Sequence, residues 1–215
     1  MKKAVIFCNG KIDNYDFVNT KKIKENILIC SDGGLRHMNK LGLVPDVFVG
    51  DNDSWNGEYP PAKEVIKCPV EKDYTDTQKC IDYAISIGCN EIELYGGLGG
   101  RIDHEYSHFC LLSYGLKNGV KIKILDEHNE IWMENKSFSL KKSEKRYVSF
   151  FPFGGNVLDF SVKGLKYTAD NILLSCDKVQ ASSNEFLGKD AEISFKKGNI
   201  IVMLCDDVRC YDENK

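Results

Sequence analysis

Hydrophobic and polar positions follow one pattern in the first half of the chain and another in the second. In the first half, short apolar runs typical of buried strands lie at residues 4–8, 26–30, 47–49, 91–95 and 121–125. Helical spacing predicts helices between some of these runs, at residues 33–41, 75–88 and 102–116. This alternation predicts a mostly parallel sheet with helices on both faces, which is a three-layer α/β domain.

From residue 130 onward the apolar runs are short, alternate with polar positions and are separated by turn residues. The predicted strands lie at residues 137–140, 147–151, 157–162, 192–195 and 200–204. Glycine-containing turns such as Gly154-Gly155 and Lys163-Gly164 lie between them. The spacing predicts an antiparallel β-sandwich or barrel, so we expect an α/β domain at residues 1–128 and an all-β domain at residues 129–215.

Composition excludes several classes of protein. The chain has 215 residues and a net charge of -3, whereas a nucleic-acid-binding protein would carry a basic stripe. The first apolar run is too short for a signal peptide, and no run approaches the length of a membrane span. The nine cysteines include no C-x-x-C pair, so neither a zinc ribbon nor a disulfide framework is indicated. We therefore expect a cytoplasmic protein without nucleic-acid or membrane partners.

Polar and glycine-rich segments follow the predicted strands of the first domain. They are Asn9-Gly10, then residues 31–34, 50–54 and 96–101. Ligands bind at the carboxyl ends of parallel strands, so these segments are expected to meet in one Rossmann-like cleft. The cleft would hold Asp32, Asp51 and Asp53, and residues 72–76 could add a further carboxylate.

This combination predicts a nucleotide-phosphate and magnesium site. Carboxylates packed together raise one another's pKa unless a cation joins them, and Mg²⁺ binds one or two carboxylates together with water and substrate phosphates. Glycine lets backbone N–H groups approach phosphate oxygens closely. Arg101 supplies a planar fork of donors that suits phosphate.

A competing motif lies at residues 104–108, which spell H-E-x-x-H, the pattern of a zinc peptidase helix. Glu127 and Glu130 lie downstream and could supply a third ligand. This hypothesis leaves the aspartates and the glycine-rich loop without a role. A simpler interpretation is one exposed histidine and one packed histidine.

The order of these motifs resembles that of the thiamin pyrophosphokinase family. The segments that carry the resemblance are residues 31–34, 45–46 with 50–54, 72–76, 96–104, 164–167 and 182–185. Together they cover nearly the whole chain. The chain departs from the family pattern at Asn52, at Tyr167, where tryptophan is frequent, and near His108, where asparagine is common.

The resemblance implies a fold, an activity and an assembly. It implies an N-terminal α/β nucleotide domain and a C-terminal β-sandwich in a homodimer, with thiamine bound between the α/β domain of one subunit and the sandwich of the other. The enzyme would be a thiamine diphosphokinase that transfers the pyrophosphoryl group of ATP to thiamine and releases AMP. Asp51, Asp53 and Asp73 would hold Mg²⁺, and Asp76 is a candidate general base.

The resemblance also assigns binding residues. Nucleotide binding would involve the glycine-loop amides and Arg101, within the set Asp32, Gly33, Gly34, Gly97, Gly99, Gly100, Asp103 and His104. Thiamine binding would involve Tyr167, Ser182, Ser183 and Asn184. Three alternatives remain open at this point: a pyrophosphokinase acting on a pterin alcohol, a zinc peptidase, and a nucleotide-binding sensor without turnover.

Overall fold

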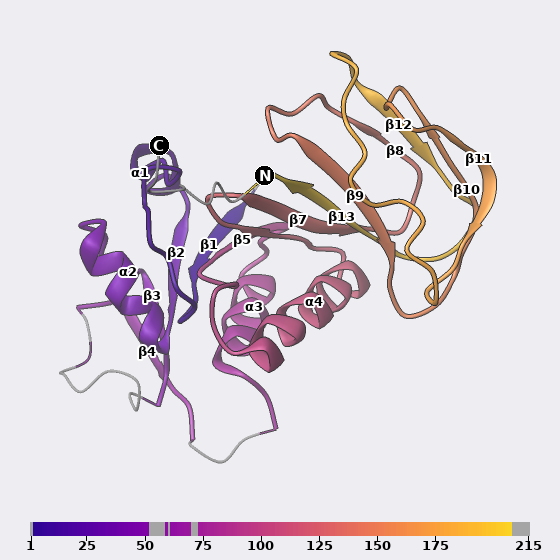
Figure 1. Ribbon diagram of the computed structural model, residues 1–215. Coiled ribbons are helices and arrows are strands. Elements are labelled where there is room, and N and C mark those ends of the chain that lie inside the picture. Colours follow the sequence, from indigo (N-terminus) through magenta and orange to yellow (C-terminus); the bar gives the residue numbers. More distant parts are fainter. Residues whose placement is uncertain (1, 52–58, 60, 70–72, 208–215) are drawn as a thin grey trace, which may run out of the picture. The chain divides into compact units, whose positions relative to one another are not determined.

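The chain folds as two compact units, Met1–Glu127 and His128–Lys215 (Figure 1). The computed structural model describes residues 2–51, 59, 61–69 and 73–207. Each unit has its own buried cluster of hydrophobic side chains, because each contains layers whose apolar faces must be covered.

The first unit is built on a sheet in which every neighbouring pair of strands is parallel. Its strands are β1 (Lys3–Phe7), β2 (Ile27–Ser31), β3 (Val47–Gly50), β4 (Glu64–Lys67), β5 (Glu91–Tyr95) and β6 (Lys121–Leu125). They lie in the order β4-β3-β2-β1-β5-β6. The predicted parallel sheet is confirmed. Strand β4 was not predicted, because three of its four side chains are exposed and it carries no apolar run.

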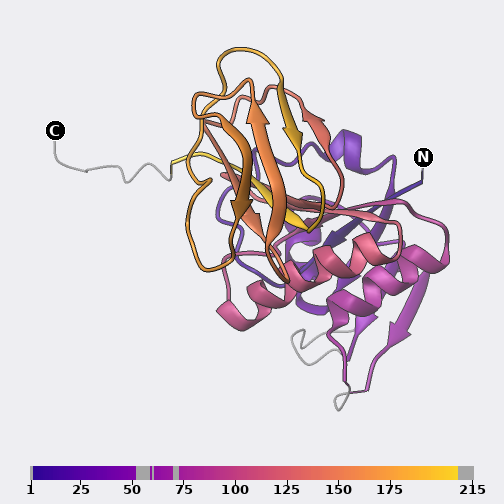
Figure 2. The ribbon, with the colours of Figure 1, turned by 90° about the vertical axis from the view of Figure 1, so that its right-hand side faces the viewer.

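Helices cover this sheet on both faces. They are α1 (Thr20–Ile23), the 3₁₀ turn η1 (Asp32–Gly34), α2 (Leu35–Lys40), α3 (Asp76–Ser86) and α4 (Ile102–Lys117). Val5, Phe7 and Phe48 point to the face that buries Leu35 and Met38 of α2. The alternate residues of the strands face α3 and α4, which lie side by side (Figure 2) and are joined by a hydrogen bond of 2.7 Å from Tyr114 to Asp82.

The strand order creates a switch point between β1 and β5. The chain leaves β1, builds β2, β3 and β4 outward on one side, and then returns to place β5 on the other side of β1. The connections that leave the carboxyl ends of β1 and β5 therefore run in opposite directions. Such a point opens a crevice at the carboxyl edge of a parallel sheet.

The second unit is a sandwich of two antiparallel sheets. Its strands are β7 (Asn129–Glu134), β8 (Phe138–Leu140), β9 (Tyr147–Pro152), β10 (Val157–Lys163), β11 (Ala169–Leu174), β12 (Ala191–Ser194) and β13 (Ile200–Cys205). One sheet has the order β7-β13-β9 and the other β11-β10-β12-β8. The predicted sandwich is confirmed. Strands β7 and β11 were not predicted.

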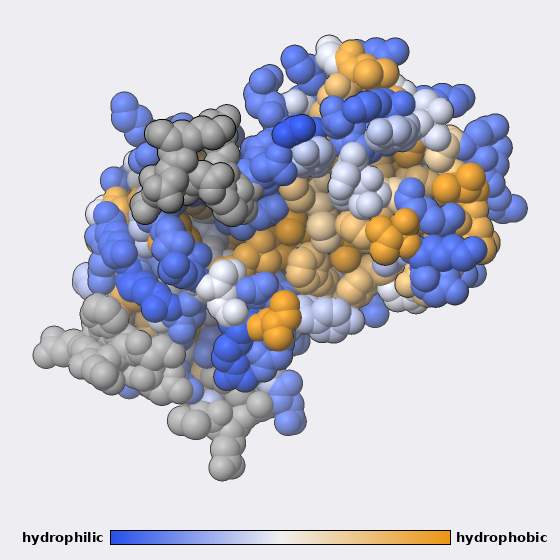
Figure 3. Space-filling view, in the orientation of Figure 1, coloured by the Kyte–Doolittle hydropathy of each residue, from blue (hydrophilic) through white to orange (hydrophobic). Residues whose placement is uncertain are grey.

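Alternation along the strands separates the two faces of the β7-β13-β9 sheet. Phe150 and Val202 point into the core of the sandwich, whereas Phe151 and Met203 lie on the opposite face and are partly exposed. Figure 3 shows an apolar area over β9 and β13. Among the described residues of the two units, no helix is long and apolar enough to cross a membrane.

Candidate active site

The first unit contains a cavity of about 480 Å³ at the switch point between β1 and β5. Its walls come from the loops after β1, β2, β3 and β5 and from the first turns of α3 and α4. They include Cys8, Asn9, Gly10, Ser31, Asp32, Asp51, Thr75, Asp76, Thr77, Gly96, Gly97, Leu98, Gly100, Arg101, His104, Glu105 and His108. The predicted meeting of these segments at one edge of the sheet is what the structure shows.

The loops after β1 and β5 are bonded backbone to backbone. Gly10 N–H donates to the Gly96 carbonyl at 2.8 Å, and Lys11 N–H donates to the Gly99 carbonyl at 3.1 Å. A Cβ atom on Gly10 would lie 2.2 Å from the Leu98 carbonyl oxygen, so no larger residue fits there. Gly96 and Gly99 adopt φ values of 67° and 78°, which glycine tolerates without strain.

Gly33 and Gly34 do not line the cavity and serve close packing instead. A Cβ atom on Gly34 would lie 2.1 Å from the Phe7 carbonyl oxygen, and one on Gly33 would lie 2.2 Å from the Asn9 side chain. These glycines let η1 approach β1 closely. That approach places Asp32, the first residue of η1, in the cavity wall.

Three of the predicted carboxylates share the cavity: Asp32, Asp51 and Asp76. Asp32 is buried and adopts a φ of 39°, a conformation uncommon for a non-glycine residue and often found at functional sites. A Cβ atom on Gly50 would lie 2.9 Å from the Asp32 carboxylate, so glycine at the end of β3 leaves room for Asp32. Asp76 begins α3, where the helix N-terminus favours negative charge.

Two other predicted metal ligands are placed differently. Asp53 lies outside the described residues. Asp73 is exposed and does not line the cavity. Over residues 2–51, 59, 61–69 and 73–207, no three His, Cys, Asp or Glu side chains form a group that could hold a metal ion. A hard cation bound by one or two carboxylates, water and phosphate needs no such group.

The glycine-rich loop ends in side chains that already have partners. Arg101 and Asp103 form an exposed ion pair with 2.6 Å between Nη2 and Oδ2, and this bond holds the pKa of Asp103 below its usual range. Glu105 accepts a hydrogen bond of 2.8 Å from Gly100 N–H. In the H-E-x-x-H pattern the glutamate would be the general base of a zinc peptidase, whereas Glu105 holds the backbone of the glycine-rich loop here.

Two buried histidines contact the backbone of the loops that form the cavity wall. His37 Nε2 lies 2.7 Å from the Gly10 carbonyl oxygen, and its Nδ1 lies 2.7 Å from the Tyr15 hydroxyl. His108 Nδ1 lies 2.6 Å from the Gly97 carbonyl oxygen. Burial lowers the pKa of both histidines, because it disfavours the imidazolium form.

The zinc peptidase hypothesis is wrong for this helix. His104 is exposed, whereas His108 is buried with both ring nitrogens directed at protein atoms. The simpler interpretation, one exposed and one packed histidine, is confirmed. Cys8 also lines the cavity, but burial raises its pKa to about 12, so it is a neutral thiol and no nucleophile.

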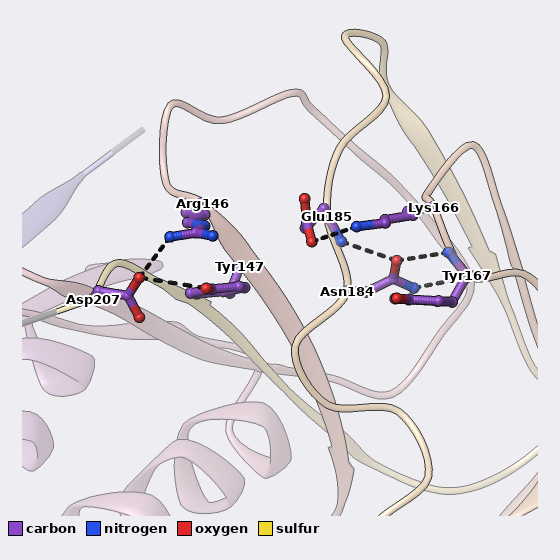
Figure 4. Close-up of polar contacts among 7 residues, drawn as sticks. All are labelled: Arg146, Tyr147, Lys166, Tyr167, Asn184, Glu185 and Asp207. Carbon is purple, nitrogen blue, oxygen red and sulfur yellow. Dashed lines mark hydrogen bonds and ion pairs between the residues drawn. The ribbon is translucent and has the colours of Figure 1, made fainter.

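Two of the predicted thiamine-binding residues, Tyr167 and Asn184, lie together in the second unit (Figure 4). Tyr167 is 61% exposed, whereas Asn184 is buried. The Asn184 amide donates to the Tyr167 carbonyl at 2.7 Å, and its oxygen accepts from the N–H groups of Tyr167 and Glu185, both at 2.9 Å. Ser182 and Ser183 are exposed, and Ser183 has a φ of 55°.

Charged side chains lie next to this loop. Lys166 forms an ion pair of 2.8 Å with Glu185, and its Nζ lies 5.6 Å from the centre of the Tyr167 ring. Arg146 pairs with Asp207 at 2.7 Å and stacks over Tyr147. The Tyr167 ring is thus an exposed apolar surface with a lysine beside it.

Comparison with known proteins connects the two regions. The model of the thiamin pyrophosphokinase catalytic domain matches residues 20–124, and that of the thiamin pyrophosphokinase vitamin B1 binding domain matches residues 136–200. Thiamine pyrophosphokinase from Bacillus subtilis is 31% identical over 193 residues, which cover 86% of this chain and 89% of the relative. The chain belongs to the thiamin pyrophosphokinase family.

Other relatives agree with this assignment. Thiamine pyrophosphokinase 1 from Oryza sativa subsp. japonica is 26% identical over 192 residues, covering 75% of this chain and 72% of the relative. A crystal structure of thiamine pyrophosphokinase from Bacillus subtilis superposes with a TM-score of 0.86 and 28% identity, covering 96% of this chain and all of that one. The α/β plus sandwich architecture is therefore that of the thiamin pyrophosphokinase family.

The family's two domain models divide the candidate residues between them. Asp32, Asp51, Asp76 and the glycine-rich loop fall in the range of the catalytic-domain model, whereas Tyr167 and Asn184 fall in that of the binding-domain model. Sequence reasoning did not identify Thr77, Glu105 or His108 as site residues. The sequence signals were the misleading H-E-x-x-H pattern, which contains Glu105 and His108, and the departure from the family pattern near His108.

Proposed function

We propose that the chain is a thiamine diphosphokinase that transfers the pyrophosphoryl group of ATP to thiamine and releases AMP and thiamine diphosphate. The observation that carries this proposal is the match of both family domains, catalytic and vitamin B1 binding, in one chain and in order. The cavity at the switch point of the first unit supports it, because such crevices bind nucleotides.

ATP is proposed to place its phosphates along the glycine-rich loop. The loop amides and the first turn of α4 offer donors to phosphate oxygens, and a helix N-terminus favours negative charge. Arg101 would bind phosphate by exchanging its exposed partner Asp103 for the stronger anion. Gly100 N–H already donates to Glu105. The part of the loop that would contact the phosphates is therefore Gly97 and Leu98, which line the cavity.

The acidic residues of the cavity fit a magnesium ion. Asp32 and Asp51 present hard oxygen donors beside the proposed phosphate positions, and Asp53 follows Asp51 closely in the sequence. Asp73 remains a proposed ligand on the resemblance alone. Bound magnesium would neutralise charge that develops on the transferred phosphates.

Thiamine is proposed to bind through the second unit. The exposed Tyr167 ring suits stacking on the cationic thiazolium, although tyrosine does so more weakly than tryptophan. Ser182 and Ser183 are the exposed polar groups of the neighbouring loop and would contact the aminopyrimidine. The Asn184 amide is occupied by Tyr167, so Asn184 would act by holding that ring in place.

In the proposed reaction the thiamine hydroxyl oxygen attacks the β-phosphorus in line. A bond forms between that oxygen and the β-phosphorus, and the bond from the β-phosphorus to the oxygen bridging to the α-phosphorus breaks. AMP departs with the bridging oxygen. The hydroxyl proton leaves to a base, for which Asp76 is the candidate because it lines the cavity.

A homodimer with shared sites is proposed on the family resemblance. A surface area rich in apolar residues, like that over β9 and β13, is typical of contacts with another chain (Figure 3). Co-expression of Asp51→Asn and Tyr167→Ala subunits tests the sharing, at a thiamine concentration low enough that the Tyr167→Ala homodimer is nearly inactive. Random assortment makes about half the dimers mixed, each with one intact site of two, so about a quarter of the activity should return. No recovery in confirmed mixed dimers would place each site within one chain.

The reaction itself is tested by product analysis. The protein, ATP, Mg²⁺ and thiamine are incubated, and the products are resolved by chromatography. AMP and thiamine diphosphate should appear in equal amounts. ADP with thiamine monophosphate would contradict pyrophosphoryl transfer, and turnover of a pterin alcohol in place of thiamine would contradict the substrate. AMP without any phosphorylated thiamine or pterin would indicate that the protein only hydrolyses the nucleotide.

A further inference from the structure

His108 occupies a buried position between the glycine-rich loop and the rest of the first unit. It lies within α4, is 6% exposed and forms part of the cavity wall. Its Nδ1 is 2.6 Å from the Gly97 carbonyl oxygen, and its Nε2 is 3.4 Å from the Thr77 hydroxyl oxygen. The ring thus joins the loop after β5 to the first turn of α3.

The partners of His108 determine where its proton lies. The Gly97 carbonyl can only accept a hydrogen bond, so Nδ1 must carry the hydrogen. The lone pair of Nε2 is then directed at the Thr77 hydroxyl, whose single hydrogen also has Cys8 Sγ as an acceptor at 3.6 Å. Thr77 is itself buried and lies 3.4 Å from the Ser31 hydroxyl, which connects the network to the end of β2.

The glycine-rich loop needs such a support. Gly96 and Gly99 have positive φ values, and glycine loses more conformational freedom on ordering than any other residue. A ligand that must order the loop itself binds more weakly than one that meets an ordered loop. The bond to Gly97 falls between these two glycines and restricts the loop where it faces the cavity.

We propose that His108 is a positioning residue for nucleotide binding, which holds the Gly97 carbonyl through Nδ1–H and so presets the loop amides for the phosphates. The proposal rests on the proposed function, because it takes the cavity to be the ATP site. It gives His108 a role without contact to the reacting atoms.

Substitutions can separate the two ring nitrogens. An asparagine side chain can place its amide nitrogen near the position of Nδ1, whereas a glutamine side chain reaches the position of Nε2. His108→Asn should keep the affinity for Mg·ATP, and the KM for ATP, within about threefold of the natural chain. His108→Gln and His108→Leu should each bind Mg·ATP about tenfold more weakly and show a KM for ATP about tenfold higher. Their kcat should change less.

Binding is measured by calorimetry with α,β-methylene ATP, whose bridge between the α- and β-phosphorus atoms cannot be cleaved. Cys110→Ser, at an exposed position of the same helix, is the control and should match the natural chain. Urea unfolding shows which variants remain folded at the assay temperature. Equal affinity of the Asn, Gln and Leu variants, or a better result for Gln than for Asn, would overturn the proposal.

Two measurements without nucleotide distinguish this proposal from the proposed function. Nitrogen NMR of the four histidines should show His108 in the Nδ1–H form. Hydrogen exchange at the amides of residues 96–100 should be faster in His108→Leu than in His108→Asn. An Nε2–H ring, or equal exchange, would overturn the positioning role even if ATP binds. An ordered loop that binds no ATP analogue would instead overturn the nucleotide assignment.

Discussion

The two regions assigned to the two substrates are built in different ways. In the first unit, the cavity lies where strands β1 and β5 end, and glycines bring backbone groups of separate loops into direct contact. In the second unit, one loop displays an exposed Tyr167 ring, and the buried Asn184 amide bonds to the backbone of that loop. The first region offers backbone donors and carboxylates, whereas the second offers mainly a ring surface.

The difference follows from the fold of each unit. A parallel sheet directs the ends of several strands to one edge, so groups far apart in the sequence meet there. In an antiparallel sandwich neighbouring strands end at opposite edges, so ligand groups come from loops that side chains hold in place. Substitutions in the first region should therefore affect chemistry and folding, and those in the second mainly the affinity for thiamine.

The largest effect is expected for Asp51→Asn. The change removes a carboxylate from the cavity and nearly keeps its shape, so kcat should fall by about a hundredfold or more. Steady-state assays at saturating substrates measure this, and circular dichroism checks the fold. Asp13→Asn, an exposed position paired with Lys11, is the control and should keep its activity. A normal kcat for Asp51→Asn would show that Asp51 takes no part in the reaction.

Close backbone packing in the first region gives the next prediction. Gly34→Ala should destabilise the first unit by about 3 kcal/mol or more, because the new Cβ would lie 2.1 Å from the Phe7 carbonyl oxygen. Gly42→Ala has no atom within 4 Å of its Cβ and suffers only from its φ of 62°, so about 1 kcal/mol is expected. Urea unfolding of the two variants compares these losses, and equal losses would refute the packing argument.

For the second region, Asn184→Ala should raise the KM for thiamine about tenfold and leave the KM for ATP unchanged. The reason is that Tyr167 loses two of its backbone hydrogen bonds. The double variant Asn184→Ala/Tyr167→Ala should be little worse than Tyr167→Ala alone, because Asn184 acts through Tyr167. Additive losses in KM would show that Asn184 contacts thiamine directly.

The smallest effect is a pH dependence of stability that arises in the first unit, from His37. Burial lowers the pKa of His37, and the neighbouring Arg36 and Lys40 lower it further, whereas the Gly10 carbonyl opposes the shift. Between this lowered pKa and the ordinary value near 6.5, the unfolded chain binds more protons, so stability falls as the pH drops below about 6.5.

A His37→Gln variant checks this, since glutamine can still donate to the Gly10 carbonyl. Its free energy of unfolding should depend less steeply on pH between pH 5 and 6.5 than that of the natural chain. Urea titrations at several pH values measure the slope. An unchanged slope would show that His37 does not contribute to it.

Much of this protein follows from its sequence alone. The period of the apolar positions determines the α/β unit and the sandwich, because each layer must bury one face, and the segments after the strands identify the cavity loops. Strands β4 and β11 escaped prediction, because most of their side chains are exposed or half-buried and such strands carry little periodic signal. Strand β7 was missed although its residues 131–133 are buried. The helix expected from residue 75 is observed as α3, and Thr75 caps it by accepting from Gln78 N–H, a contact that depends only on neighbouring residues.

Other features were decided only by the tertiary structure. His104 and Glu105 belong to one short motif with His108, yet the first is exposed, the second holds Gly100, and the third holds Gly97. Asn184 is directed at the backbone of a loop that is distant in sequence. Whether a polar side chain meets a ligand or another part of the chain depends on packing between distant segments, which no local pattern encodes.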